Sequence, residues 1–454
     1  MLNRPLGSPD SRRVPAPAIE TGLFPGALLG SRAGTRSLSV SALPGLPLYG
    51  LLKAIAASIL FCNGLADLPR SIPVGPVTGH AILTIAYYFA GLLFVVITPV
   101  LEPPKPSKTL PLVFFLFWGA TSLAWTPSFV DGFQNLLALG TMPLLLTVGE
   151  ATASTVPGFS HWVIRCLDAA AFTGASIYAA SVVFWGAGTD AVITARSFGL
   201  FAVYGVASQL VKWRYGRKSG LLWAAAITVL IGVSESRLML GIAVVLFPLA
   251  QIPAAGLRRC LRVAVVTAVV AGLSYGAFNY FDALRDRFLK GDVSLKVGDI
   301  SINGSGRAAF WRTTLESWSE APVWGKGAGS SEGLIESVFI TVGHPHNDYL
   351  RILHDYGIIG ETLWIVAIST LLVCVWRTWR RADVARQKER APLLVALLML
   401  VAFALSMTAE NVMVIAFVTA PVGLVVGSAL GAARARRIFA QLRSPQLFAR
   451  RAHT

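Results

Sequence analysis

Long, continuous hydrophobic runs separated by short polar connections make up most of this chain. An apolar run of about 20 residues crosses the bilayer core as a helix, because only helices and closed barrels satisfy their backbone hydrogen bonds there. The runs are continuous and do not alternate with polar residues, which favours helices over strands. Twelve such runs lie at residues 43–65, 80–101, 110–125, 132–149, 163–188, 197–213, 219–234, 238–255, 263–281, 350–376, 391–409 and 412–433. The pattern predicts an all-α polytopic membrane protein with about 12 transmembrane helices.

The polar segments between and beside these runs define the domain organisation. Residues 43–281 are expected to hold spans 1–9 and residues 349–433 spans 10–12, with one large loop at 282–348 between spans 9 and 10. Loops of this length inside a compact domain are usually functional or disordered. The segment 1–42 is expected to be a disordered basic tail, and 434–454 a second basic tail. Some runs are short for a full crossing, so one pair could be re-entrant and the count lies between 10 and 12.

Two features of the large loop indicate structure within it. Trp311, Leu315 and Trp318 recur at helical spacing, which predicts an amphipathic helix. This helix either lies on the outer membrane surface, with its tryptophans at headgroup level, or packs on the helix bundle. The sequence Gly325-x-Gly327-x-Gly329 follows without a preceding strand, so it is only a weak match to a nucleotide-binding motif. It is expected to form a turn that lets backbone approach a ligand or another helix.

The charge of the chain reports its orientation in the membrane. Hydrophobic residues make up 54% of the chain and charged residues 14%, with a net charge of +16. Basic clusters occur at 212–218, 258–262 and 377–390 and in both tails, which an alternating path places on one side of the membrane. Because cytoplasmic loops are enriched in Lys and Arg, both termini are expected in the cytoplasm and the large loop in the periplasm. The positive charge then reflects orientation and anionic lipid contact, and no nucleic-acid partner is expected.

Several polar residues are expected to converge on the outer side of the membrane. They are three arginines, two histidines and their neighbours: Arg196, Arg237, Arg307, His344, His346, Asn347, Asp348 and Glu410. Arginine binds phosphate with paired hydrogen bonds, histidine exchanges a proton near neutral pH, and a carboxylate can orient it. The set suits a substrate with a pyrophosphate and a hydroxyl nucleophile. Taken singly, each arginine could instead be a side chain that reaches lipid headgroups.

The segment 343–360 concentrates this chemistry, with three histidines in eleven positions. His354 is expected to be a packed, hydrogen-bonded helix residue. Asp355 could pair with Arg351, four residues earlier on the same helix, or line a cavity. His346 and His344 both remain candidates for the base.

The sequence of this segment also resembles a known family. His346-Asn347, nine further residues and then Gly357-x-x-Gly360 are similar to the H-N-x9-G-x-x-G signature of the bacterial O-antigen ligase and polysaccharide polymerase superfamily. Weaker similarities to that family are Gly306-Arg307 with Trp311, Pro322 with the three glycines that follow it, Arg196 with Leu200, and Ser236-Arg237. The resemblance covers roughly residues 110–430.

The resemblance implies an inverting glycosyltransferase that needs no metal and no cofactor. Such an enzyme moves a glycan from undecaprenyl pyrophosphate to an acceptor hydroxyl at the periplasmic face of the bacterial inner membrane. The acceptor is another lipid-linked glycan for an O-antigen or exopolysaccharide polymerase, and lipid A core for a lipopolysaccharide O-antigen ligase. His346, with His344 as second candidate, would act as base, and Arg196, Arg237 and Arg307 would bind pyrophosphate. Asn347, Asp348 and Glu410 would support them.

Two other classes of function compete with the enzyme. A secondary transporter or an exporter of a polysaccharide or its lipid-linked precursor would also have many spans and polar residues within the membrane. Transporters usually contain two similar halves, and the single large loop at 282–348 makes this chain lopsided. A scaffold of a polysaccharide assembly complex would give the outer arginines and histidines no role, although such a complex remains a possible partner.

Overall fold

The computed structural model describes residues 46–65, 73–74, 77–97, 109–252, 257–280, 285, 295–297, 300–302, 306–339, 343–382 and 387–442. All of them belong to one compact unit, Leu46–Thr454. The tail expected at 1–42 lies outside the described residues, as do parts of the large loop and the end of the second tail.

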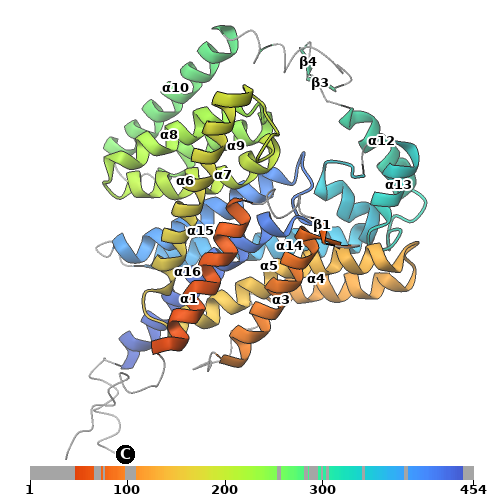
Figure 1. The fold of residues 1–454 in the computed structure, drawn as a ribbon, viewed down its shortest axis with the longest axis horizontal. Helices are drawn as coiled ribbons and strands as arrows, with labels where there is room; N and C mark the ends of the chain where they lie inside the picture. Colours follow the sequence, from red (N-terminus) through yellow and green to blue (C-terminus); the bar gives the residue numbers. More distant parts are fainter. Residues whose placement is uncertain are drawn as a thin grey trace, which may run out of the picture. The chain divides into compact units, whose positions relative to one another are not determined.

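Every one of the twelve hydrophobic runs forms a helix, which confirms the all-α class (Figure 1). The helices are α1 Leu46–Gly64, α3 Gly79–Ile97, α4 Leu110–Thr121, α5 Phe129–Thr155, α6 Phe159–Trp185, α7 Ala195–Arg214, α8 Lys218–Val233, α9 Arg237–Leu249, α10 Leu257–Tyr280, α14 Asp348–Arg381, α15 Gln387–Ser406 and α16 Ala416–Leu442. A 3-10 turn, η3 Ser122–Ala124, extends α4. Two short antiparallel pairs lie in connections: β1 Pro73–Val74 with β2 Val77–Thr78, and β3 Leu295–Val297 with β4 Ile300–Ile302.

Four helices of the described chain, α5, α6, α14 and α16, are long and apolar enough to cross a membrane by length and composition. α5 has 27 residues and is therefore much longer than the run at 132–149 that predicted it. α16 continues to Leu442, so the boundary expected at 433 between membrane and tail falls inside a helix. The full number of crossings stays a prediction.

The contact between α5 and α16 forms the centre of the unit. α16 places Gly423, Gly427 and Gly431 along one face at intervals of four residues. A Cβ atom at these positions would collide with the backbone carbonyls of Met142, Leu146 and Glu150 on α5. Small residues at this spacing let two helix backbones approach closely, which is a frequent way to pack helices in membranes.

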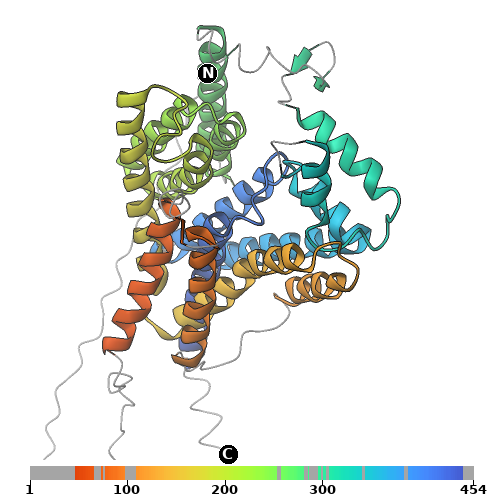
Figure 2. The ribbon, with the colours of Figure 1, turned by 45° about the vertical axis from the view of Figure 1, so that its right-hand side comes forward.

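The described part of the large loop contains two helices, α12 Arg307–Trp318 and α13 Ser330–Val338, that pack against the start of α14 (Figures 1 and 2). The expected amphipathic helix exists, but its buried face is not the expected one. Phe310 and Thr314 are buried, whereas Leu315 is 40% exposed. Thr314 can be buried because its hydroxyl donates to the carbonyl of Phe310.

The tryptophans of α12 make polar contacts with neighbouring loops. The indole N–H of Trp311 donates to the carbonyl of Pro345 at 3.0 Å, and that of Trp318 to the carbonyl of Pro322 at 3.2 Å. These bonds tie α12 to the segments on either side of α13. The helix therefore packs on protein at both positions.

The Gly-rich segment after Pro322 lies against a break in α14. Gly357 has φ 66° and ψ −171°, which interrupts the helix. The carbonyls of His354 and Asp355 accept hydrogen bonds from the backbone N–H groups of Lys326 and Gly327, at 2.8 and 2.9 Å. The expectation that this turn lets backbone approach another helix is confirmed.

Candidate functional site

Three segments that are far apart in the sequence meet at the carboxylate of Glu410. Glu410 is buried in the connection between α15 and α16. Nη2 of Arg196, at the start of α7, lies 2.6 Å from its Oε2, and Nη2 of Arg307, at the start of α12, lies 3.1 Å from its Oε1. We call Arg196, Arg307, His346 and Glu410 the Glu410 cluster. Its two guanidinium groups exceed its one carboxylate, so the cluster has a positive charge even when His346 is neutral.

His346 faces the same carboxylate. Its Nδ1 lies 3.8 Å from Oε2 of Glu410, which is an ion-pair distance, and 3.4 Å from Nδ2 of Asn411. The opposite ring nitrogen, Nε2, is therefore turned away from Glu410. His346 has φ 52°, a left-handed conformation that is costly for a residue with a Cβ. Such strain is often retained at functional sites.

Burial by itself would raise the pKa of the Glu410 carboxyl. The interaction with His346 and the charges of Arg196 and Arg307 outweigh this effect and hold the pKa below its ordinary value of 4.5. Glu410 is therefore ionised at neutral pH.

This lowered pKa predicts an acid-sensitive contribution to stability. A group whose pKa is lower in the folded state stabilises the fold above its unfolded-state pKa and loses that effect as the pH falls through the folded-state pKa. A Glu410→Gln variant is expected to have a lower melting temperature than the wild type at pH 7. This difference in melting temperature should narrow as the pH falls below 4.5. Thermal unfolding between pH 7 and pH 3 measures this difference. The control Glu316→Gln, at an exposed position, should have nearly the melting temperature of the wild type at every pH. A difference for Glu410→Gln that does not depend on pH would contradict the lowered pKa of Glu410.

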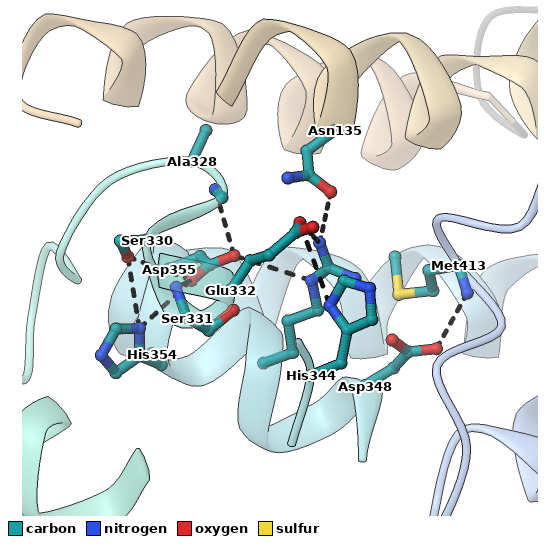
Figure 3. A network of polar contacts seen from close by, with 12 residues as sticks. Asn135, Ala328, Ser330, Ser331, Glu332, His344, Asp348, His354, Asp355 and Met413 are labelled. Atoms are coloured by element: carbon teal, nitrogen blue, oxygen red, sulfur yellow. Dashed lines mark hydrogen bonds and ion pairs between the residues drawn. The ribbon is translucent and has the colours of Figure 1, made fainter. Parts of the chain in front are cut away.

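His344 belongs to a second group of residues, which we call the Arg351 cluster: Asn135, Glu332, His344 and Arg351 (Figure 3). Nδ1 of His344 and Nη2 of Arg351 each lie 3.9 Å from Oε2 of Glu332. Nη2 of Arg351 also donates to Oδ1 of Asn135 on α5. Burial, followed by the charge of Arg351, lowers the pKa of His344 to about 3, so this imidazole is neutral at pH 7. The structure thus separates the two histidines into different electrostatic surroundings.

Asp355 is buried and binds the N-terminus of α13. Its Oδ1 accepts from the backbone N–H of Ser331 at 2.8 Å and from the hydroxyl of Ser330 at 3.1 Å, while Oδ2 accepts from the N–H of Gly329 at 3.2 Å. A carboxylate stabilises a helix N-terminus through these free N–H groups and the helix dipole. The expected pairing with Arg351 is also present, at 3.8 Å.

His354 is a buried, hydrogen-bonded helix residue, as expected. Its Nε2 lies 3.0 Å from the hydroxyl of Ser317 on α12. Its Nδ1 lies 3.2 Å from the hydroxyl of Ser330 on α13 (Figure 3). It therefore helps to attach both loop helices to α14.

Asn347 and Asp348 hold the start of α14. The side chain of Asn347 caps the helix by accepting from the N–H of Leu350 at 3.1 Å. Oδ2 of Asp348 accepts from the N–H groups of Val412 and Met413, at 2.6 and 2.8 Å. Asp348 thus fixes the connection that carries Glu410 against the start of α14, and a supporting role of both residues in the site stays a prediction.

Arg237 is the first residue of α9. Gly199 of α7 lies so close to Ser236 and Met239 that a Cβ there would meet them at 3.0 to 3.1 Å. The start of α9 therefore lies beside the first turns of α7, which begins with Arg196. A role for the Arg237 side chain in the site stays a prediction.

Residues 182–365 match the family model described as O-antigen ligase. This segment is similar to the O-antigen ligase family, which supports the resemblance to the O-antigen ligase and polysaccharide polymerase superfamily. The O-antigen ligase match includes Arg196, Arg237, Arg307, His344 and His346, and it ends before Glu410. No curated protein matches the chain. Together with the four apolar helices, this match suggests a membrane enzyme of the glycosyltransferase type.

Proposed function

We propose that this protein transfers a glycan, with inversion, from undecaprenyl pyrophosphate to a sugar hydroxyl at the periplasmic face of the inner membrane. The observation that carries the proposal is the meeting of two arginines and one histidine at the buried carboxylate of Glu410. The arginines suit a pyrophosphate, and the histidine with its carboxylate suits removal of a proton from a hydroxyl.

In this reaction the oxygen of the acceptor hydroxyl attacks the anomeric carbon of the donor sugar. The bond between that carbon and the pyrophosphate oxygen breaks, and the lipid pyrophosphate leaves with the electron pair. Nε2 of His346 takes the hydroxyl proton, because Nδ1 faces Glu410. The ionised Glu410 stabilises the imidazolium that forms, as a carboxylate does in catalytic triads.

The arginines stabilise the charge that develops on the leaving pyrophosphate. The side chain of Arg196 is 41% exposed and that of Arg307 is 22% exposed, so both are open to a ligand while they contact Glu410. Each guanidinium has five N–H donors, and the contact with Glu410 leaves others for phosphate oxygens. Arg237 is proposed as a third contact on the same side. Groups that bind charge as it develops often make the largest contribution to catalysis.

An Arg307→Ala variant is expected to bind undecaprenyl pyrophosphate at least about tenfold more weakly, since a hydrogen bond to a charged group contributes about 1.5–3 kcal/mol. The purified full chain, titrated with the lipid in detergent, gives the affinity. Arg312→Ala is the matched control, because Arg312 is exposed on the same helix and should leave the affinity unchanged. Equal affinities for Arg307→Ala and the wild type would remove Arg307 from the pyrophosphate site.

The polysaccharide profile of a deletion strain would distinguish the two activities of the family. Loss of a polymerase leaves single-repeat glycans, because repeats are no longer joined. Loss of a ligase leaves long chains on the carrier lipid, because they no longer reach lipid A core. An unchanged profile would count against both.

A further inference from the structure

The mechanism above makes no use of the Arg351 cluster, yet this cluster contains buried polar groups without partners. Arg351 is only 4% exposed, and its Nη1 has no hydrogen-bond partner within the described part of the chain. Nδ1 of His344 also lacks a hydrogen bond there. Buried donors and acceptors without partners are costly and rare in proteins. Arg351 and His344 both lie beside the carboxylate of Glu332, so their unsatisfied nitrogens indicate one place for a polar ligand.

Glu332 is the more exposed edge of this cluster. Its side chain is 34% exposed and lies 3.9 Å from both Arg351 and His344. A ligand that reaches Glu332 from solvent therefore lies beside Arg351 and His344, whose unsatisfied nitrogens are buried behind it. Burial raises the pKa of the Glu332 carboxyl, and the charge of Arg351 opposes this rise.

The charge balance selects the class of ligand. Glu332 and Asp355 both face Arg351, whereas His344 is neutral at pH 7. Two carboxyl groups therefore face one guanidinium at Arg351. The Glu410 cluster has the opposite ratio, with two guanidinium groups at one carboxylate. A pyrophosphate or a uronic acid would be repelled by these carboxylates. Neutral hydroxyl groups both donate and accept, so they match a carboxylate, a guanidinium and a neutral imidazole together.

The two clusters are neighbours because His344 and His346 are separated only by Pro345. Two residues of fully extended chain span about 7 Å, so the Cα atoms of the two histidines lie no farther apart than that. His346 also acts on His344 electrostatically, so a ligand in the Arg351 cluster lies near the residue that would take the proton.

We propose that the Arg351 cluster binds a neutral sugar residue of the acceptor and so presents its hydroxyl to His346. Glu332 accepts a hydrogen bond from one sugar hydroxyl, and Nη1 of Arg351 donates to another. His344 completes the contact as a neutral hydrogen-bonding group. This assignment rests on the proposed transferase function, and it makes Glu332 and His344 determinants of acceptor specificity.

The test measures sugar binding without any donor. Ligand-observed NMR on the detergent-purified full chain would compare the methyl glycosides of glucose, galactose and N-acetylglucosamine with methyl glucuronide. We expect at least one neutral glycoside to bind, and methyl glucuronide to bind at least about tenfold more weakly than methyl glucoside. Glu332→Gln and His344→Gln should each weaken neutral glycoside binding at least about tenfold. The matched control is Glu336→Gln, an exposed glutamate one turn along α13, which should bind as the wild type does.

Transfer kinetics distinguish this proposal from the function on which it rests. Glu332→Gln should raise the KM for the acceptor about tenfold and leave the KM for the donor and the binding of undecaprenyl pyrophosphate unchanged. If glycosides bind but no transfer occurs, the mechanism at the Glu410 cluster fails and the sugar subsite stands. The subsite proposal is overturned if no neutral glycoside binds the wild type, or if both variants bind as the wild type does. It is equally overturned if both variants lose thermal stability and donor binding together, because the cluster would then be structural.

Discussion

A His346→Ala variant is expected to lose about 10²–10⁴-fold in glycan transfer, the range in which a positioned general base contributes to catalysis. The loss should appear in kcat, because His346 acts on the proton of the attacking hydroxyl. Binding of undecaprenyl pyrophosphate should persist, because Arg196 and Arg307 contact Glu410 independently of the imidazole. Single-turnover transfer with purified protein in detergent, together with lipid titration, measures both quantities.

Two further variants separate proton transfer from simple packing. His346→Gln keeps a polar side chain of similar size beside Glu410 but has no basic nitrogen, so it should be as inactive as His346→Ala. Added imidazole should restore part of the activity of His346→Ala alone, because it fits the space that the substitution opens. Transfer at the wild-type rate in His346→Ala would exclude the proposed base. Wild-type activity in His346→Gln would reduce the residue to a positioning role.

The sequence predicted the helices and the side of the membrane on which their connections lie. Each long apolar run became a helix. A helix satisfies all backbone hydrogen bonds within its own segment, which is what an apolar segment in a membrane requires. The alternation of spans placed the starts of α7 and α9, the large loop and the connection after α15 on one side. The contacts of Arg196 and Arg307 with Glu410 show that the start of α7, the large loop and the connection after α15 do meet.

The sequence was less informative wherever a polar residue finds its partner on a distant element. Thr314 and Ser317 face inward on α12 because each has a hydrogen-bond partner, so the apolar stripe at 311, 315 and 318 did not identify the buried face. α13 was missed because the carboxylate that holds its first turn, Asp355, belongs to α14. The environment of His344 depends on Arg351 and on Asn135 of α5, and nothing in their spacing reveals this.

The break in α14 was also hidden, because residues 350–376 were taken as one continuous helical run, although Gly357 is part of the motif that resembles the family signature. Its conformation is one that only glycine adopts readily. A Cβ atom there would collide with the carbonyl oxygen of Val323 and lie 2.7 Å from the backbone nitrogen of Gly325. Both obstacles are backbone atoms, so no side-chain rotation relieves them. Gly357 is thus the position where the Pro322–Gly329 segment, and with it α13, is attached to α14.

A Gly357→Ala variant is therefore expected to lose about 3 kcal/mol or more of stability, through backbone strain together with the collision. The midpoint of thermal unfolding in detergent reports this loss. Gly333→Ala is the matched control, because Gly333 is exposed in α13 and a Cβ there meets no atom within 4 Å. Alanine exceeds glycine in helix propensity by up to about 1 kcal/mol, so this control should melt at the wild-type temperature or above. If Gly357→Ala melted as Gly333→Ala does, the break at Gly357 would not be what attaches the loop helices. Glycan transfer should also fall in Gly357→Ala, because Glu332 lies on α13 and Arg307 on α12, the two helices that this attachment positions.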